Sequence, residues 1–193
     1  MRFISIDSSL SHTGWCVGEI TNPIGFKRDE IRIEDIGLIT TENETKKKNV
    51  RASSDTVRRC RVTAHGLMDV MDTYKPEIIF VETPSGSQNA NAMKSYGATC
   101  QLIAFMNPDP IEVSPIEAKL ASVGTKTASK EEIIRWAYKK YPNLEWHTSR
   151  GGIDVGEVKL AKDNEHIADS IAIAYAGILT PEFVRLKSII NAK

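Results

Sequence analysis

The order of hydrophobic and polar positions predicts strands at the start of the chain. Apolar and polar residues alternate toward a core in Phe3–Asp7, and after a polar turn Trp15–Ile20 offers a second short strand. Ile31–Ile33 and Ile36–Thr40 supply a third strand, with a bulge expected around Gly37. Three antiparallel strands therefore open the predicted fold.

The rest of the chain alternates helical and strand patterns. From Arg51 to Tyr74 apolar residues recur at three- and four-residue steps, which predicts an amphipathic helix. The nearly continuous apolar run Glu77–Glu82 is typical of a buried parallel strand, and it ends on a carboxylate. Alternating elements of this kind indicate an α/β fold. The further predicted elements are a strand at Ile111–Val113 and helices at Asn89–Met106, Pro115–Ala121, Ser129–Tyr141 and Asn164–Leu179.

Length and composition favour one domain. With 193 residues and 41% hydrophobic content, the whole chain, 1–193, is expected to form a single domain with a proper core. A Gly- and polar-rich stretch predicts a long loop at about 142–162, and 181–193 is expected to be a short tail. The loop contains aromatic and basic residues that can contact nucleic acid, although a merely variable loop is the favoured interpretation: Trp146, His147, Arg150 and Lys159.

Charge does not by itself indicate a nucleic-acid partner, because Lys+Arg and Asp+Glu both number 25. The distribution is more informative than the total. Basic residues gather in two runs that favour phosphate contact over ordinary solvated faces: Lys46, Lys47, Lys48, Arg51, Arg58, Arg59 and Arg61, and then Lys119, Lys126, Lys130, Arg135, Lys139 and Lys140.

Location is indicated by the N-terminus and the cysteines. Met1 leads directly into a strand pattern without a signal sequence, and no apolar run approaches the roughly 18 residues of a membrane span. The three cysteines are widely spaced and form no zinc or redox motif. We therefore expect a soluble cytoplasmic protein with no membrane partner.

Four residues combine into a candidate metal site. Asp7 and Glu82 end apolar strands, and His166 and Asp169 lie three residues apart, on one face of a helix. Each alone has a commoner explanation as a cap, a solvated boundary or a surface residue. Together, oxygen-rich ligation with one imidazole favours Mg²⁺, with Mn²⁺ able to substitute. Two such ions would support phosphodiester hydrolysis.

Four ordered motifs resemble the RuvC family of Holliday-junction resolvases, the crossover junction endodeoxyribonucleases of the RNase H-like superfamily. The resemblance spans Met1 to Leu179. The motifs are Ile4–Trp15 with its Asp7, Ile79–Glu82 with the following Asn89–Ala98, Ser114–Lys130 with its lysines, and His166–Ala174.

The resemblance implies a fold, an activity and partners. The fold would be RNase H-like, with a mixed five-stranded sheet flanked by helices. The protein would be a dimeric, metal-dependent endonuclease that cleaves Holliday junctions and other branched DNA. The implied catalytic and metal-binding set is Asp7, Glu82, His166 and Asp169, and the residues expected to bind DNA are Lys119 and Lys130, joined from the basic runs by Lys126 and Arg58.

Departures from the family pattern leave alternatives open. His166 stands where many members have an acid, and residues 83–88 lack the aromatic residue that often wedges into the junction. Broader branched-DNA cleavage, in a phage-type or bacterial member, becomes the favoured interpretation. An RNase H-like nuclease acting on RNA or an RNA–DNA hybrid is one alternative, and a catalytically inactive junction-binding protein is another. A sugar-kinase or actin-like ATPase is disfavoured, because Gly-rich phosphate loops are missing.

Overall fold

The computed structural model describes residues 1–21, 31–45, 50–83 and 90–191. The side chains at 90–92, 94, 190 and 191 are not described. The elements, in chain order, are β1 (Arg2–Ser8), β2 (His12–Ile20), β3 (Ile31–Thr40), α2 (Ala52–Tyr74), β4 (Ile78–Glu82), α3 (Ala90–Ala104), β5 (Ile111–Val113), α4 (Pro115–Ser122), α5 (Lys130–Lys140), β6 (Thr148–Val155), β7 (Val158–Leu160), α6 (Asn164–Gly177) and α7 (Pro181–Asn191).

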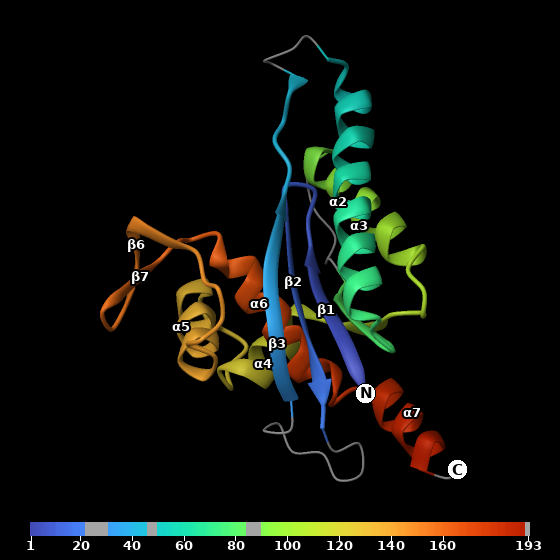
Figure 1. Cartoon of the computed structure of the whole chain (residues 1–193). Coiled ribbons are helices and arrows are strands. Elements are labelled where there is room, and N and C mark those ends of the chain that lie inside the picture. The colour runs from blue at the N-terminus through green and yellow to red at the C-terminus, as the bar shows by residue number, and fades with distance from the viewer. Residues whose placement is uncertain (22–30, 46–49, 84–89, 192–193) are drawn as a thin grey trace.

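Five strands form one mixed sheet in the order β3-β2-β1-β4-β5 (Figure 1). Strand β2 pairs antiparallel with β1 and β3, whereas β4 pairs parallel with β1 and β5. Strands β6 and β7 form a separate hairpin beside α5. The predicted α/β class, with three antiparallel strands followed by parallel ones, is confirmed.

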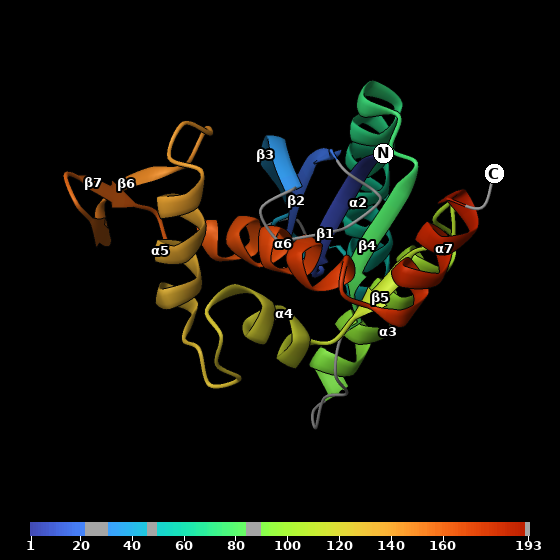
Figure 2. The same cartoon turned by 90° about the horizontal axis from the view of Figure 1, so that it is seen from below.

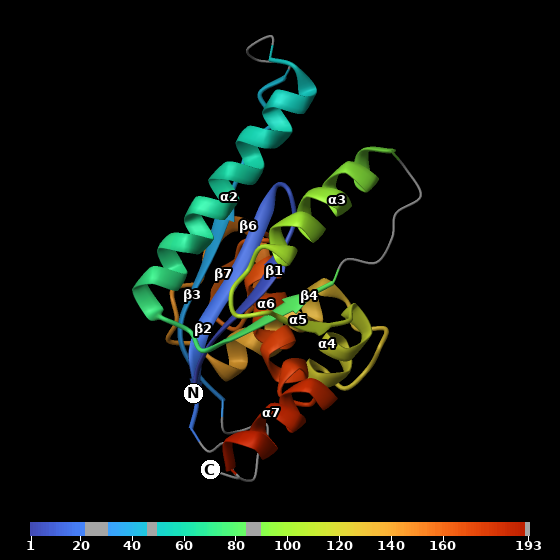
Figure 3. The ribbon, with the colours of Figure 1, turned by 90° about the vertical axis from the view of Figure 1, so that its right-hand side faces the viewer.

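Helices cover both faces of the sheet. Figure 3 shows α2 and α3 in front of the strands, and Figure 2 shows α6 crossing the opposite face with α4 and α5 beyond it. Because successive side chains of a strand point to opposite faces, the core is divided in two. Phe3 packs into the core on the α6 side, and its neighbour Ile4 packs into the core on the α2 side.

Helix α6 is buried along most of its length, and two glycines permit its close approach to the sheet. A Cβ atom at Gly14 would lie 2.0 Å from the carbonyl oxygen of His166, and one at Gly177 would lie 2.2 Å from Cδ1 of Phe80. Because glycine lacks a Cβ atom, the first turn of α6 can rest on β2 at Gly14. This contact determines where the side chains of that turn lie.

Local sequence signals explain the helix starts. Ser114 and Ser129 cap α4 and α5, and each forms a reciprocal capping box with the Glu three residues later. Pro115 occupies the first turn of α4, where its missing N–H costs no hydrogen bond. The predicted starts of both helices are confirmed, and the predicted helix ending at Tyr74 is present as α2.

The prediction of a long loop at about 142–162 is wrong, because much of this stretch forms the β6-β7 hairpin. Ile153, Val155 and Leu160 are buried in the core on the α6 side, which fixes the hairpin against α5. Trp146 also has a structural role: its Nε1 atom donates a hydrogen bond of 2.9 Å to the carbonyl oxygen of Tyr141. Arg150 and Lys159 remain exposed.

Two strand details also differ from the prediction. Strand β2 begins at His12, three residues before the predicted start at Trp15. The irregularity of β3 does not lie around Gly37. The register shifts at Val17/Gly18, which face Asp35 and Ile33, so Glu34 is the extra residue.

The predicted C-terminal tail is helical as α7, up to Asn191. Its Phe183 is fully buried and packs on Phe80, with ring centroids 5.7 Å apart. Within the described ranges no single helix is long and apolar enough to cross a membrane, and α6 with α7 passes that test only as a pair bent by 57°.

Candidate active site

Asp7 and Glu82 lie at the carboxyl ends of two neighbouring parallel strands. The paired residues of the β1-β4 ladder end one position before them, so both carboxylates reach the same edge of the sheet. Because side chains alternate along a strand, Asp7 points to the same face as Phe3, and Glu82 points to the same face as Phe80. This is the face that α6 covers. Strand order and side-chain alternation therefore bring two acids 75 residues apart in sequence to one place.

The first turns of α6 bring His166 and Asp169 to the same edge. Nδ1 of His166 lies 2.7 Å from Oδ2 of Asp7, and both side chains are mostly buried, with exposed fractions of 18% and 15%. Asp169 follows one helical turn later and lies close enough to Asp7 for their charges to repel. The structure thus gathers the three acids and the one imidazole that the sequence singled out.

Burial and mutual repulsion perturb the two inner carboxyls strongly. Burial, together with the negative charges of Asp7 and Asp169, raises the pKa of Glu82 to about 8. Burial and the charge of Asp7 raise the pKa of Asp169 to about 7, although His166 and Lys130 act in the opposite direction. The site therefore concentrates more negative charge than its own cations neutralise.

His166 is held in a charged environment. Burial alone would lower the pKa of its imidazole, but the hydrogen bond to Asp7 and the negative charges of Asp7, Glu165 and Asp169 raise it above the ordinary value. The imidazole Nε2 lies 3.5 Å from Oε1 of Glu165. One ring nitrogen of His166, Nδ1, thus faces Asp7, and the other, Nε2, faces Glu165.

Two of the four predicted DNA-binding residues lie beside this cluster. The positive charge of Lys119, on α4, lowers the pKa of Glu82 and partly offsets its rise. Lys130, the first residue of α5, places Nζ 2.8 Å from Oε1 of Glu165. This hydrogen bond, followed by the surrounding negative charges, raises the pKa of Lys130. Its side chain is 68% exposed, so it can also reach a phosphate.

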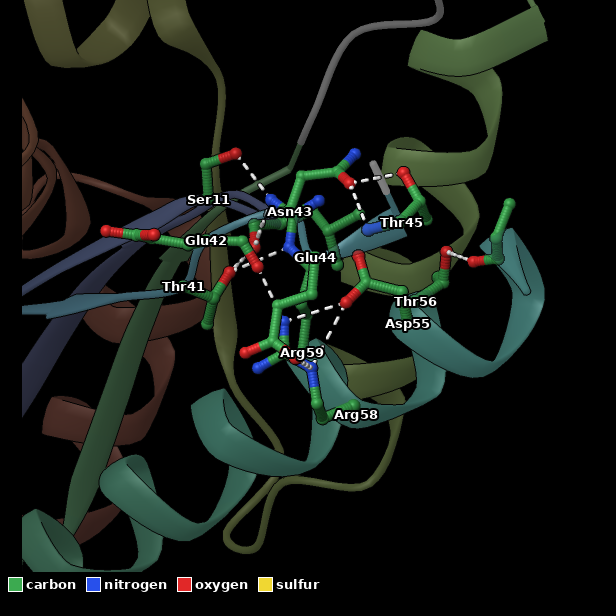
Figure 4. A network of polar contacts seen from close by, with 12 residues as sticks. Ser11, Thr41, Glu42, Asn43, Glu44, Thr45, Asp55, Thr56, Arg58 and Arg59 are labelled. Carbon is green, nitrogen blue, oxygen red and sulfur yellow. Dashed lines mark hydrogen bonds and ion pairs between the residues drawn. The ribbon is translucent and has the colours of Figure 1, made fainter. Parts of the chain in front are cut away.

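The other two lie elsewhere. Lys126 is exposed in the connection between α4 and α5. Arg58 belongs to α2 on the opposite face of the sheet, where it donates hydrogen bonds to Asp55 at 2.8 and 3.1 Å and to the carbonyl oxygen of Glu42 at 2.5 Å (Figure 4). These bonds give Arg58 a structural task, and its contact with DNA stays a prediction.

Sequence reasoning missed two residues at the site. Glu165 links Lys130 to His166, and His12 stacks on the His166 ring. His12 lies two positions before Gly14 in one strand, and this spacing places it on the face that meets α6. The two-residue spacing of His12 and Gly14 could have identified His12 from the sequence. Lys46, Lys47 and Lys48 of the first basic run lie outside the described residues, as do residues 84–88 of the segment in which the resemblance led us to expect an aromatic wedge.

The donor set fits a divalent cation. Three carboxyls and one imidazole provide mainly hard oxygen ligands, and a bound cation would relieve the repulsion that raises the pKa of Glu82 and Asp169. In the described part of the chain, no three His, Cys, Asp or Glu side chains already stand where they could hold a metal ion together. Ligation therefore requires side-chain adjustment, beginning with the bond between Asp7 and His166.

Comparison with known sequences finds relatives that carry the same name. No protein-family model matches the chain. The crossover junction endodeoxyribonuclease RuvC of Endomicrobium trichonymphae is 29% identical over 139 residues, which cover 70% of this chain and 66% of the relative. This chain thus spans about two thirds of that relative's length. The RuvC of Carboxydothermus hydrogenoformans is 26% identical over 183 residues, covering 93% of this chain and 96% of the relative.

Comparison with solved structures agrees. The structure of T. thermophilus RuvC in complex with Holliday junction substrate has a TM-score of 0.62 and 18% identity, covering 91% of this chain and 92% of that one. At this identity the likeness shows the fold, and the predicted RNase H-like architecture is confirmed. In sequence this chain is similar to RuvC proteins, and in structure it shares their RNase H-like fold.

Proposed function

We propose that the protein is a metal-dependent, structure-specific endonuclease that cleaves Holliday junctions by phosphodiester hydrolysis. The observation that carries this proposal is the cluster of Asp7, Glu82, His166 and Asp169 at one edge of the sheet. Such a charged, half-buried cluster is unfavourable for the fold alone, and strongly perturbed carboxyls of this kind are typical of functional sites. The relatives named crossover junction endodeoxyribonuclease supply the reaction class.

The proposed cofactor is Mg²⁺, and Mn²⁺ would be able to substitute. We propose that two ions bind. Asp7, Glu82, Asp169 and His166 would hold them. Ions bound there would supply activation of water and charge stabilisation at the leaving 3′-oxygen, yielding a 5′-phosphate and a 3′-hydroxyl. A single imidazole among carboxylates makes Mn²⁺ more acceptable than in an all-oxygen site.

The chain's own residues bind and orient the DNA. Lys130 begins α5, so its ammonium group and the helix N-terminus attract the same phosphate. Lys119 approaches the site from α4, near Glu82. Lys126, between these two helices, would contact a phosphate further along the strand, and Arg58 a more distant one. The partial burial of the acids excludes water and strengthens these charge interactions.

The proposed substrates include branched DNA other than four-way junctions. Residues 83–88 carry no aromatic side chain that could stack in the junction. Base stacking is worth about 1–3 kcal/mol per base, so its loss weakens the preference for one junction shape. Forks and related branches would then be cut as well.

We propose that the active form is a homodimer joined through α2 and α3. An apolar groove of about 630 Å³ lies between these helices, and its lining includes Val57, Met68, Leu102, Phe105 and Met106. Phe105 is 89% exposed and Met68 is 59% exposed, which is costly unless another surface covers them. A second copy is the proposed occupant, since a two-fold dimer presents two active sites to a near-two-fold junction. The whole chain would act as one nuclease domain.

A cleavage assay tests the function. A four-way junction, a Y-shaped fork, linear duplex and an RNA–DNA hybrid are incubated with the protein in Mg²⁺ and in Mn²⁺. Asp7→Asn serves as the inactive variant, and Asp109→Asn, at an exposed carboxylate, is the matched control. We expect paired nicks in the junction, cutting of the fork, no cutting by Asp7→Asn and full cutting by Asp109→Asn.

Other outcomes would redirect the proposal. Cleavage of the hybrid alone would favour an RNase H-type activity, and junction binding without cleavage would favour a binding protein. Full cleavage by Asp7→Asn would contradict the metal assignment. Sedimentation analysis of the wild type and of Phe105→Ser tests the dimer, which the substitution should weaken.

A further inference from the structure

The imidazole ring of His12 stacks on that of His166 with nearly parallel planes. The centroids of the two imidazole rings lie 5.2 Å apart and the ring planes differ by 7°. His12 is the first residue of β2 and shares a face with Gly14, on which the backbone of His166 rests. His166 is therefore contacted by one strand at two levels, its backbone by Gly14 and its ring by His12.

The turn that carries His12 is tightly closed. The backbone N–H of His12 donates to Oγ of Ser9 at 3.1 Å, and that hydroxyl donates to the carbonyl oxygen of His12 at 2.7 Å. The N–H of Ser9 donates to the same carbonyl oxygen at 3.1 Å, and Oγ1 of Thr13 donates to the carbonyl oxygen of Ser9 at 3.2 Å. Both backbone groups of His12 are thus held in place.

Arg59 ties this turn to α2 (Figure 4). Its guanidinium, on a residue only 7% exposed, donates to the carbonyl oxygen of Leu10 at 3.1 Å and to Oγ of Ser11 at 2.6 Å. It also donates to Oγ1 of Thr41 at 2.9 Å, and the N–H of Thr41 donates to the carbonyl oxygen of Ser11 at 2.9 Å. A buried guanidinium with several acceptors makes a rigid support. The backbone of the turn that precedes His12 is therefore held in place by Arg59 of α2.

We propose that His12 is a positioning residue that fixes the plane of the His166 imidazole. The hydrogen bond from Nδ1 of His166 to Asp7 restrains one edge of the ring, but it leaves rotation about that bond possible. A parallel ring on a fixed turn removes this freedom. The ring plane of His166 then stays fixed while its bond to Asp7 adjusts to a cation, which lowers the ordering cost of ligation. This role rests on the proposed metal-dependent function.

The planar ring of His12 carries the effect, so variants can separate packing from hydrogen-bonding chemistry. His12→Ala removes the stacking partner, and His12→Phe keeps a planar ring without nitrogens. His65→Ala, at an exposed histidine of α2, is the matched control. Residues that orient a ligand typically affect metal affinity or activity by about 10- to 100-fold.

Three measurements are made on each variant. They are the Mn²⁺ concentration for half-maximal junction cleavage, the Mn²⁺-induced rise in Tm, and junction binding in Ca²⁺. For His12→Ala we expect an increase of about tenfold in the required Mn²⁺ and a smaller Tm rise, with unchanged junction binding. His12→Phe should return the required Mn²⁺ to near the wild-type value, and His65→Ala should match the wild type.

The stack itself is tested without any activity. In the wild-type protein, NMR should show proximity between the His12 and His166 ring protons, and His12→Phe should preserve a ring-current shift on His166 that His12→Ala loses. Absence of that proximity would overturn the proposal even if His12→Ala failed to fold.

The remaining outcomes are also decisive. Unchanged Mn²⁺ dependence in His12→Ala would overturn the proposal. Equal defects in His12→Ala and His12→Phe would do the same, because the nitrogens would then be the active groups. A wild type that neither cleaves nor is stabilised by Mn²⁺, yet shows the ring proximity, would refute the proposed function and not the stack.

Discussion

Replacing Glu82 by Gln is expected to stabilise the metal-free protein at alkaline pH. Glu82 has an ordinary pKa of 4.5, which rises to about 8 in the folded protein because of burial and the charges of Asp7 and Asp169. Between these two values the folded state binds more protons than the unfolded state, so the free energy of unfolding falls as pH rises. Gln cannot ionise, and the variant should escape this loss.

The size of this stabilisation follows from the difference between the two pKa values of Glu82. At about 1.36 kcal/mol per pKa unit, the rise from 4.5 to about 8 corresponds to an upper limit of about 5 kcal/mol. Water entry and side-chain adjustment around a half-buried group reduce this value, so we expect a gain of about 1–3 kcal/mol at about pH 9. At about pH 4, where Glu82 is protonated in both states, the variant and wild type should be nearly equal.

Urea denaturation in EDTA at several pH values measures this effect. Glu112→Gln, at an exposed carboxylate of β5, is the control and should leave the pH dependence unchanged. Added Mn²⁺ should stabilise the wild type and have little effect on Glu82→Gln, because a ligand has been lost. A Glu82→Gln protein that is no more stable than the wild type at about pH 9 would refute the electrostatic reasoning.

Three further perturbations test other parts of the structure. Lys130→Ala should weaken junction binding and lower the slope of log affinity against log salt by about 1, with an unchanged Tm; an unchanged slope, measured by fluorescence anisotropy, would contradict the phosphate contact. Gly14→Ala should destabilise the fold by at least about 1–3 kcal/mol in urea denaturation and reduce cleavage, because its Cβ would meet the His166 carbonyl oxygen; wild-type stability would show that α6 can shift freely. Arg58→Ala should lower the Tm more than Arg61→Ala, since Arg58 pairs with the buried Asp55, and equal Tm values would argue against that structural role.

The four candidate metal ligands could be identified from sequence because their signals are local. Asp7 and Glu82 end apolar strands, and the spacing of His166 and Asp169 places them on one helix face. Their meeting depends on β1 and β4 being parallel neighbours and on α6 crossing that face. The pattern and the family resemblance anticipated that these side chains would lie together, and their role as metal ligands stays a prediction.

Other features could not be foreseen, because they depend on packing between distant segments. The β6-β7 hairpin has a Gly- and polar-rich sequence typical of a loop, and only the burial of Ile153, Val155 and Leu160 against the core orders it. Arg58 looks like a member of a basic run, yet its partners are Asp55 and the Glu42 carbonyl oxygen. Charge counted along the chain does not show which cations are already paired.

By itself the sequence determined most of the strand and helix pattern, the helix caps and the types of residue available for metal chemistry, since alternation, turn spacing and capping act over a few residues. Only the tertiary structure decided that Gly14 admits the first turn of α6, that His12 stacks on His166, and that burial raises the pKa of Glu82. These properties arise where strands and helices distant in sequence exclude water from a shared space. The free energy of each such contact depends on residues distant in sequence, which a local sequence pattern does not identify.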